Sequence, residues 1–282
     1  MFHYFNHLLS DTLATRSYWL WYVMEVSLDI LVILFFVAGA AGFIDAMAGG
    51  GGLLTLPALL AAGVPPTNAL ATNKLQSSFG SFSASMYFVR SGIVNLKEMR
   101  LAIVCTFIGA ATGAVLVQQF DTSFLTSLIP ILLVAISLYF LFAPQTRADS
   151  GKKPLSEAAF AYSVGSCVGF YDGFFGPGTG SIFTVCFVVL GHFTLVEATA
   201  RTKVLNFTSN IAALLFFVIA GLPIWKLGLV MAVGQFIGAR VGAKVVISKG
   251  QKWIRPLVIV MSMLMAFKLL WEQHSQWFLS MF

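Results

Sequence analysis

The sequence predicts an all-α integral membrane protein built from two homologous halves that are inverted relative to each other. Hydrophobic residues make up 58% of the 282 positions, charged residues make up 10%, and the mean hydropathy is +0.87. Soluble domains carry about 45–50% apolar and about 25% charged residues. The chain also contains uncharged runs of membrane-spanning length and a glycine-rich motif that occurs twice. We expect about eight to ten transmembrane or half-membrane helices.

The first half, residues 26–143, follows an N-terminal extension, residues 1–25, that has no counterpart later in the chain. The extension lacks the small-residue cleavage site of a signal peptide, and both Met1 and Met24 remain candidates for the natural start. The apolar segments of this half are expected at Leu28–Met47, Leu53–Ala62, Ala69–Val89, Leu101–Val117 and Phe124–Phe142.

The second half, residues 155–282, begins after a linker, residues 144–154, that is rich in charge and turn-forming residues. The two short segments, Leu53–Ala62 in the first half and Ser181–Leu190 in this one, either cross the membrane or re-enter it. The apolar segments of the second half are expected at Leu155–Phe175, Ser181–Leu190, Ala198–Ile219, Leu227–Val246 and Pro256–Trp271.

The distribution of Lys and Arg sets the expected orientation. They cluster in the loops at residues 90–100, 147–153 and 249–255, which is the positive-inside signature of cytoplasmic loops. The link at residues 118–123 carries only Asp121 and belongs outside. The chain is inside both before Leu155 and at the 249–255 loop, so it crosses the membrane an even number of times between them. On this count the 90–100 loop lies inside, while its repeat counterpart, residues 221–226, lies outside. The halves are therefore inverted, as in many secondary transporters, and both termini are expected in the periplasm.

The doubled motif reads GFIDAMAGGGG at residues 42–52 and GFYDGFFGPGTG at residues 169–180, and each copy leads through an apolar run to a lysine. Asp172 follows Asp45 by 127 residues, whereas Lys203 follows Lys74 by 129. Further along the chain, glycine, phenylalanine and lysine residues of the first half again recur 129 residues later in the second half. The copies also differ. At the first spacing Thr184 stands where the first copy has Pro57, and at the second Thr202 stands where it has Asn73, so the two half-sites are not expected to bind identically.

The glycine clusters predict a helix break at membrane depth. Each glycine in a helix interior costs about 1 kcal/mol relative to alanine, and Pro177 opposes a helix further. A break leaves free N–H groups with partial positive charge at the start of the next half-helix, which suits an anion. Close helix packing is the alternative role for these glycines. The backbone expected to bind substrate is that of Gly50, Gly51, Gly52, Gly178, Thr179 and Gly180.

Lys74 and Lys203 are the strongest candidates for side chains that bind substrate, because an ionisable group inside a membrane helix destabilises it unless the group is hydrated or paired. Each is expected to head a long apolar helix and to contact an anionic substrate. The alternative is that each lysine reaches the headgroups along its aliphatic stem. Replacement of either lysine by alanine is expected to stop anion movement with near-normal protein abundance. Further substrate contacts are expected from Asn73, Arg201, Asn206 and Asn210.

Asp45 and Asp172 form the other repeated pair. A carboxylate beside a glycine break can carry a proton or another coupling ion. It can equally cap a helix or balance the charge of a nearby lysine, and the sequence leaves these alternatives open.

The doubled motif, followed by NALATNKLQ in the first half and ATARTKVLN in the second, resembles the sulfite exporter family of the TauE/SafE type. The resemblance extends from Val26 to Glu272. It implies export or uptake of small anions such as sulfite, sulfonates or organic acids across the bacterial inner membrane, coupled to an ion gradient. The expected partners are a small anionic substrate and the lipid bilayer, and a homodimer is left open.

Other functional classes fit the sequence less well. The net charge of +6 resides in short loops, so we expect no nucleic-acid partner. Catalytic constellations such as HExxH are missing, which predicts no enzyme activity and no cofactor. The three cysteines lack CxxC spacing, and His192 and His274 lack nearby ligand types, which predicts no metal site. A passive anion channel and a membrane scaffold without transport activity remain as alternatives.

Overall fold

The fold is a helical bundle in a computed structural model that describes residues 27–121 and 155–249, together with residues 123–125, 127–129, 131–133 and 135. These described residues contain helices and no strand, which confirms the all-α fold class. The predicted N-terminal extension, the central linker and the last apolar segment lie outside them.

The helices follow the predicted apolar segments closely, and four of the described helices, α2, α5, α10 and α11, are long and apolar enough to span a membrane. The first half contains α2 (Leu28–Ala48), α3 (Gly52–Ala61), α4 (Pro66–Arg90) and α5 (Arg100–Val117). The second half contains α7 (Glu157–Phe160), a π-helical turn (Ala161–Gly165), α8 (Ser166–Phe174), α9 (Thr179–Val189), α10 (Leu195–Ile219) and α11 (Trp225–Lys249).

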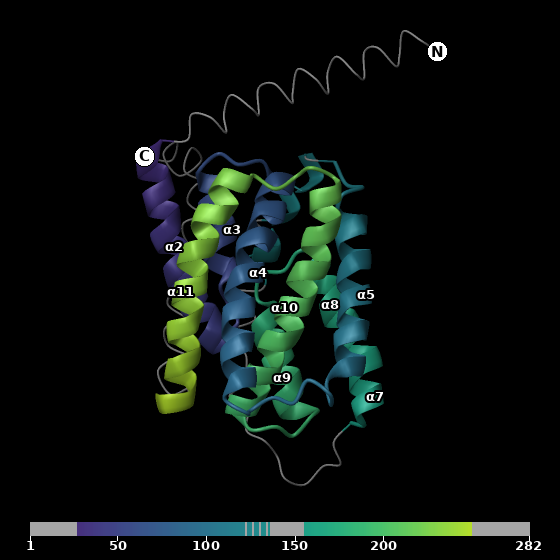
Figure 1. Cartoon of the computed structure of the whole chain (residues 1–282). Helices are drawn as coiled ribbons and strands as arrows, with labels where there is room; N and C mark the ends of the chain where they lie inside the picture. Colours follow the sequence, from purple (N-terminus) through teal and green to yellow (C-terminus); the bar gives the residue numbers. More distant parts are fainter. Residues whose placement is uncertain are drawn as a thin grey trace, which may run out of the picture.

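The two predicted helix breaks are present. α2 ends at Ala48 before α3 begins at Gly52, and α8 ends at Phe174 before α9 begins at Thr179. Gly49 has a φ of 80° and Gly178 a φ of 84°, in the left-handed region that glycine enters without a steric penalty. In Figure 1, α3 lies in the upper part of the bundle and α9 in the lower part. This placement agrees with the inversion of the two halves, which stays a prediction.

Two seams of small residues join one half to the other. α2 packs in parallel against α11 on one side of the bundle, and α5 packs against α8 on the other (Figure 1). A Cβ added at Gly238 of α11 would overlap the backbone carbonyl of Gly39 in α2, and one added at Gly173 of α8 would overlap that of Ala110 in α5. Such close backbone approach is how membrane helices gain packing contacts without a hydrophobic driving force.

The α2/α11 seam gives a direct test of this packing. Gly238→Ala is expected to destabilise the protein by about 1–3 kcal/mol, because the added methyl meets rigid backbone. Gly39→Ala is the matched control on the same seam, since its Cβ would lie 3.6 Å from the nearest atom, an ordinary contact. The measurement is the thermal midpoint of each purified variant in detergent. Equal midpoints for the two variants would contradict the proposed close approach.

α4 and α10 lie antiparallel at the centre of the bundle. Asn68, near the start of α4, donates to the carbonyl of Leu222 just after α10 at 2.8 Å. Arg201, near the start of α10, pairs with Glu98 beyond the end of α4 at 3.4 Å. Both helices bury many polar side chains, which explains why α4 is less apolar than the spanning helices around it. The polar centre of the bundle therefore belongs to both halves.

Candidate functional site

The two helix breaks meet each other directly. A Cβ at Gly49 would overlap the backbone of Gly180, and one at Gly52 would lie 3.1 Å from the Cα of Pro177. Ser181 donates its hydroxyl to the carbonyl of Ala48 across the same contact. The irregular backbone of each half is thus buried against that of the other, as required for non-helical backbone at membrane depth.

Lys74 and Lys203 lie in the middle of the membrane helices and not at their ends. Each is the ninth residue of a 25-residue helix, and each is 1% exposed. The expectation that they head their helices was wrong, because α4 and α10 begin three residues before the predicted apolar runs. Pro66 occupies the first helical position, where its missing N–H is not needed, and Thr194 begins α10 with a capping box. Extension of the lysines to the headgroups is excluded by their burial.

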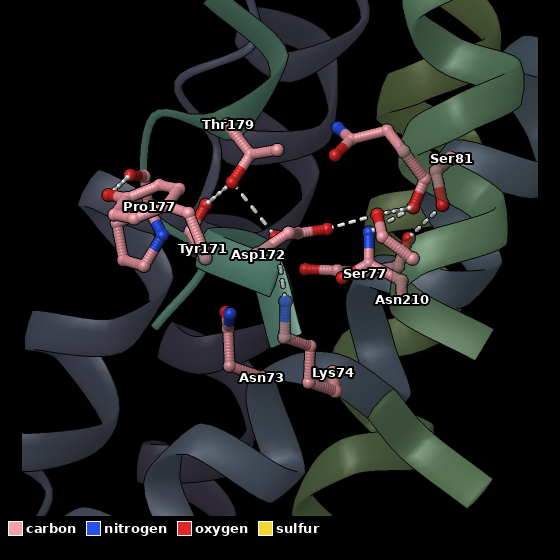
Figure 2. Close-up of polar contacts among 12 residues, drawn as sticks. Asn73, Lys74, Ser77, Ser81, Tyr171, Asp172, Pro177, Thr179 and Asn210 are labelled. Carbon is pink, nitrogen blue, oxygen red and sulfur yellow. Dashed lines mark hydrogen bonds and ion pairs between the residues drawn. The ribbon is translucent and has the colours of Figure 1, made fainter. Parts of the chain in front are cut away.

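Each lysine pairs with the aspartate of the opposite half. The Nζ of Lys74 lies 2.8 Å from Oδ1 of Asp172, and the Nζ of Lys203 lies 2.9 Å from Oδ2 of Asp45. Figure 2 shows the first pair, with the Lys74 ammonium pointing at the Asp172 carboxylate. The pairs cross between the halves, so that four buried charges sum to zero at the place where the breaks meet. In this arrangement each acid balances the charge of a lysine, and a role of the acids in ion coupling stays a prediction.

Further donors hold both carboxylates. The N–H of Gly51 donates to Oδ1 of Asp45 at 3.2 Å. The hydroxyl of Thr179 donates to Oδ1 of Asp172 at 2.9 Å, and the hydroxyl of Ser209 donates to Oδ2 of the same residue. The carboxylate of Asp45 therefore occupies part of the positive start of α3, which the sequence analysis assigned to an external anion.

A small polar cavity of about 20 Å³ lies between the breaks. A cavity needs at least about 10–15 Å³ to hold one water molecule, so this one has room for about one water and is too small for a multi-atom anion. The substrate space is thus contracted in this arrangement of the helices. The cavity is lined by Asp45, Gly49, Gly52, Asn73, Lys74, Ser77, Asp172, Gly176, Gly178, Gly180, Asn206 and Asn210.

The chain is similar over most of its length to a known group of proteins. The sequence profile of the sulfite exporter TauE/SafE family matches residues 34–269. The chain belongs to this family.

Its relatives within the TauE/SafE group share nearly their whole length with it. Probable membrane transporter protein YfcA of Escherichia coli (strain K12) is 52% identical over 251 residues, covering 89% of this chain and 93% of that protein. Probable membrane transporter protein of Haemophilus influenzae is 47% identical over 255 residues, covering 90% and 99%. Probable membrane transporter protein YunE of Bacillus subtilis (strain 168) is 23% identical over 271 residues, covering 88% and 98%. No solved structure matches the chain.

In this TauE/SafE family member, most of the residues predicted to bind substrate line the cavity, and five do not. Gly51 contributes its N–H to Asp45, and Thr179 contributes its hydroxyl to Asp172. Lys203 does not line the cavity itself, although its partner Asp45 does. The predicted residues that line it are Asn73, Lys74, Gly52, Gly178, Gly180, Asn206, Asn210, Asp45 and Asp172.

Arg201 lies away from the cavity lining. Its guanidinium stacks over the ring of Phe193 at 4.1 Å and pairs with Glu98 in the loop after α4. Two residues along an α-helix turn the side chain by about 200°, so Arg201 and Lys203 face different sides of α10. Gly50 is buried in the α2–α3 break but is likewise not part of the lining.

Two hydrogen bonds fix where the two copies of the motif correspond. Thr55 donates to Asn73 at 2.6 Å, and Thr184 donates to Thr202 at 3.1 Å. Both partners in the second bond stand 129 residues after those in the first, so Thr184 corresponds to Thr55 and not to Pro57. The two-residue insertion therefore lies within the glycine break of the second copy. Asn73 and Thr202 occupy equivalent positions in the two copies, so the predicted difference between the two half-sites at this position is present.

Sequence reasoning missed the role of Ser209, which donates to Asp172. Ser209 follows Asn206 by three residues, so it lies near the same face of α10 as Asn206. That spacing is the signal by which it could have been found.

Proposed function

We propose that this protein is a secondary transporter that moves small anions such as sulfite, sulfonates or organic acids across the inner membrane. The observation that carries the proposal is the crossed pairing of Lys74 with Asp172 and of Lys203 with Asp45 at two touching helix breaks. Each pair joins the halves, so movement of one half against the other must strain or break both pairs. The relatives' names as membrane transporters support the same conclusion.

The groups around the cavity favour an anion as the substrate. Lysine ammonium groups and backbone N–H groups at the starts of α3 and α9 are donors, and the side-chain amides of Asn73, Asn206 and Asn210 add more. The N–H groups of Gly52 and Gly180 have no acceptor among the described residues. An anion that enters must compete with Asp45 or Asp172 for a lysine, and this competition provides a route to coupling with an ion gradient.

Two contacts of different chemistry join the halves towards the two ends of the bundle, and we propose that they close the cavity. At one end, the backbone N–H of Ile224 donates to the buried hydroxyl of Thr72 at 3.0 Å. At the other end, the Arg201–Glu98 pair joins α10 to the loop after α4, where Glu98 is 49% exposed. The second end carries most of the described loop cations, so we place it in the cytoplasm by the positive-inside rule. Alternating access would open one end at a time.

The exposed ion pair predicts which replacement loosens the basic end. Glu98→Gln is expected to raise, by about twofold to fivefold, the labelling rate of Ser77→Cys by an impermeant thiol reagent added from that end, since an exposed pair contributes about 0–1 kcal/mol. The natural cysteines, Cys105, Cys167 and Cys186, are replaced beforehand. Glu157→Gln, an exposed glutamate at the same end, is the control. Faster labelling only from the opposite end would contradict this assignment.

The proposed function is tested by flux in liposomes containing the purified protein. Methanesulfonate is a suitable probe because it stays ionised and does not leak as a neutral acid, and sulfite is measured beside it. A coupled transporter accumulates the anion when a pH difference is imposed. A channel gives flux that follows the anion gradient and ignores the pH difference, and a scaffold gives no flux above that of protein-free liposomes.

A further inference from the structure

The two buried carboxylates, Asp45 and Asp172, occupy repeated positions in the sequence but differ in their hydrogen-bond donors and in their exposure. Asp172 receives Lys74 and the hydroxyls of Thr179 and Ser209, and its side chain is 2% exposed. Asp45 receives Lys203 and one long backbone bond of 3.2 Å from Gly51, and its side chain is 12% exposed.

This difference decides which carboxylate can be neutralised with little disturbance. A proton on Asp172 would remove the negative charge that three side-chain donors share, and it would weaken all three of these bonds. A proton on Asp45 competes only with the Lys203 ammonium, because the Gly51 N–H bonds to the other oxygen. Both carboxylates line the cavity, but the side chain of Asp45 is the more exposed of the two, so a proton reaches it more easily through the same space as the substrate.

The charges around Asp45 are accounted for on each neighbouring element. Lys203 of α10 faces it, while Lys74 of α4 is held by Asp172 of α8. On α11, Arg240 and Lys244 are exposed, and Arg240 stacks over Tyr87 at 4.7 Å. α3 and α9 bring only glycines, Gly52 and Gly180, to the cavity lining and no further charge.

Charge balance then sets the stoichiometry. The four buried charges sum to zero, and a low-dielectric interior strongly disfavours an added net charge. A proton that binds Asp45 removes one negative charge and releases the Lys203 ammonium, which can then pair with one monovalent anion. The site remains neutral: the ion pair of Lys203 with Asp45 is exchanged for one with the anion, and the only covalent bond formed is that between Asp45 and the proton.

On the basis of the proposed anion transport, we infer that Asp45 is the carboxylate that takes up the transported proton and that one proton moves with one monovalent anion. Asp172 keeps its charge throughout and positions Lys74 and the start of α9. Transport is therefore electroneutral, and a divalent anion such as sulfate is a poor substrate.

The test uses methanesulfonate flux in liposomes with Asp45→Asn and Asp172→Asn. Asp45→Asn mimics the protonated residue, so it should lose the acceleration by an imposed pH difference and keep exchange of internal for external anion. Asp172→Asn should lose both. In the native protein, a potassium diffusion potential should leave the pH-driven rate unchanged. Retained acceleration in Asp45→Asn, or a rate that follows the potential, would overturn the inference.

A second readout does not depend on flux or on the asparagine variants being abundant. Infrared difference spectra of the purified protein between neutral and acidic pH should show a neutral carboxyl band that shifts in Asp45→Glu and is unchanged in the matched Asp172→Glu. A band that shifts only in Asp172→Glu would overturn the assignment. If the native protein shows no flux but the band belongs to Asp45, the proposed transport fails while the proton assignment stands.

Discussion

Replacement of Lys74 or Lys203 by alanine is expected to abolish anion flux and also to lower the amount of folded protein. Each change leaves a buried carboxylate, that of Asp172 or Asp45, without its cation. Removal of one partner from a buried pair costs about 3–5 kcal/mol, a large part of the roughly 5–15 kcal/mol that stabilises a typical domain. The near-normal abundance expected from the sequence is therefore revised.

The measurement combines flux in liposomes with the monodisperse fraction on size-exclusion chromatography in detergent. Lys97→Ala is the matched control, because Lys97 is an exposed lysine in the loop after α4 and should change neither quantity. Full flux in Lys74→Ala would refute a role for that lysine, whatever the abundance.

Neutralising both members of one pair is expected to restore the fold without restoring transport. Lys74→Met alone leaves Asp172 unpaired, whereas Lys74→Met with Asp172→Asn removes both charges. The amide oxygen that Asp172→Asn introduces can still accept a hydrogen bond from Thr179 or Ser209. Replacement of a whole buried pair is often neutral or even stabilising, so the double variant should recover about 3–5 kcal/mol relative to the worse single variant.

This recovery must be specific to the pair. Lys97→Met combined with Asp172→Asn is the control, since Lys97 does not contact Asp172, and it should be no more stable than Asp172→Asn alone. The readout is the thermal midpoint of each purified variant, with flux measured on the same samples. Additive effects of Lys74→Met and Asp172→Asn would show that the 2.8 Å contact contributes no coupling free energy.

Much of the fold follows from the sequence because its signals are local. Uninterrupted apolar runs locate the helices, and the glycine clusters locate both breaks, since glycine lowers helix stability wherever it occurs. The starts of α4 and α10 were misjudged by three residues, because a proline and a capping box extend a helix beyond its apolar run. The ends of a helix are therefore predicted better when N-terminal prolines and capping residues are considered together with hydropathy.

The sequence predicts which acids and lysines form the site, but it does not predict which acid pairs with which lysine. Within each half the motif supplies one acid and one lysine, and the sequence gives no reason to pair Lys74 with Asp172 in place of Asp45. The crossing depends on how the halves pack, which is a long-range property: Lys74 and Asp172 are 98 positions apart, and Asp45 and Lys203 are 158. The unequal support of the two acids arises in the same way, because Ser209 reaches Asp172 through the packing of α10 against α8.

The most direct test of the central claim is methanesulfonate flux through a variant in which all four buried charges are neutralised. This variant combines Lys74→Met, Asp172→Asn, Lys203→Met and Asp45→Asn, and it should fold to a monodisperse species because no buried charge is left unpaired. The crossed pairs are proposed to bind the anion and to couple its movement, so the folded variant should give no flux above that of protein-free liposomes. Flux equal to that of the native protein would contradict the account.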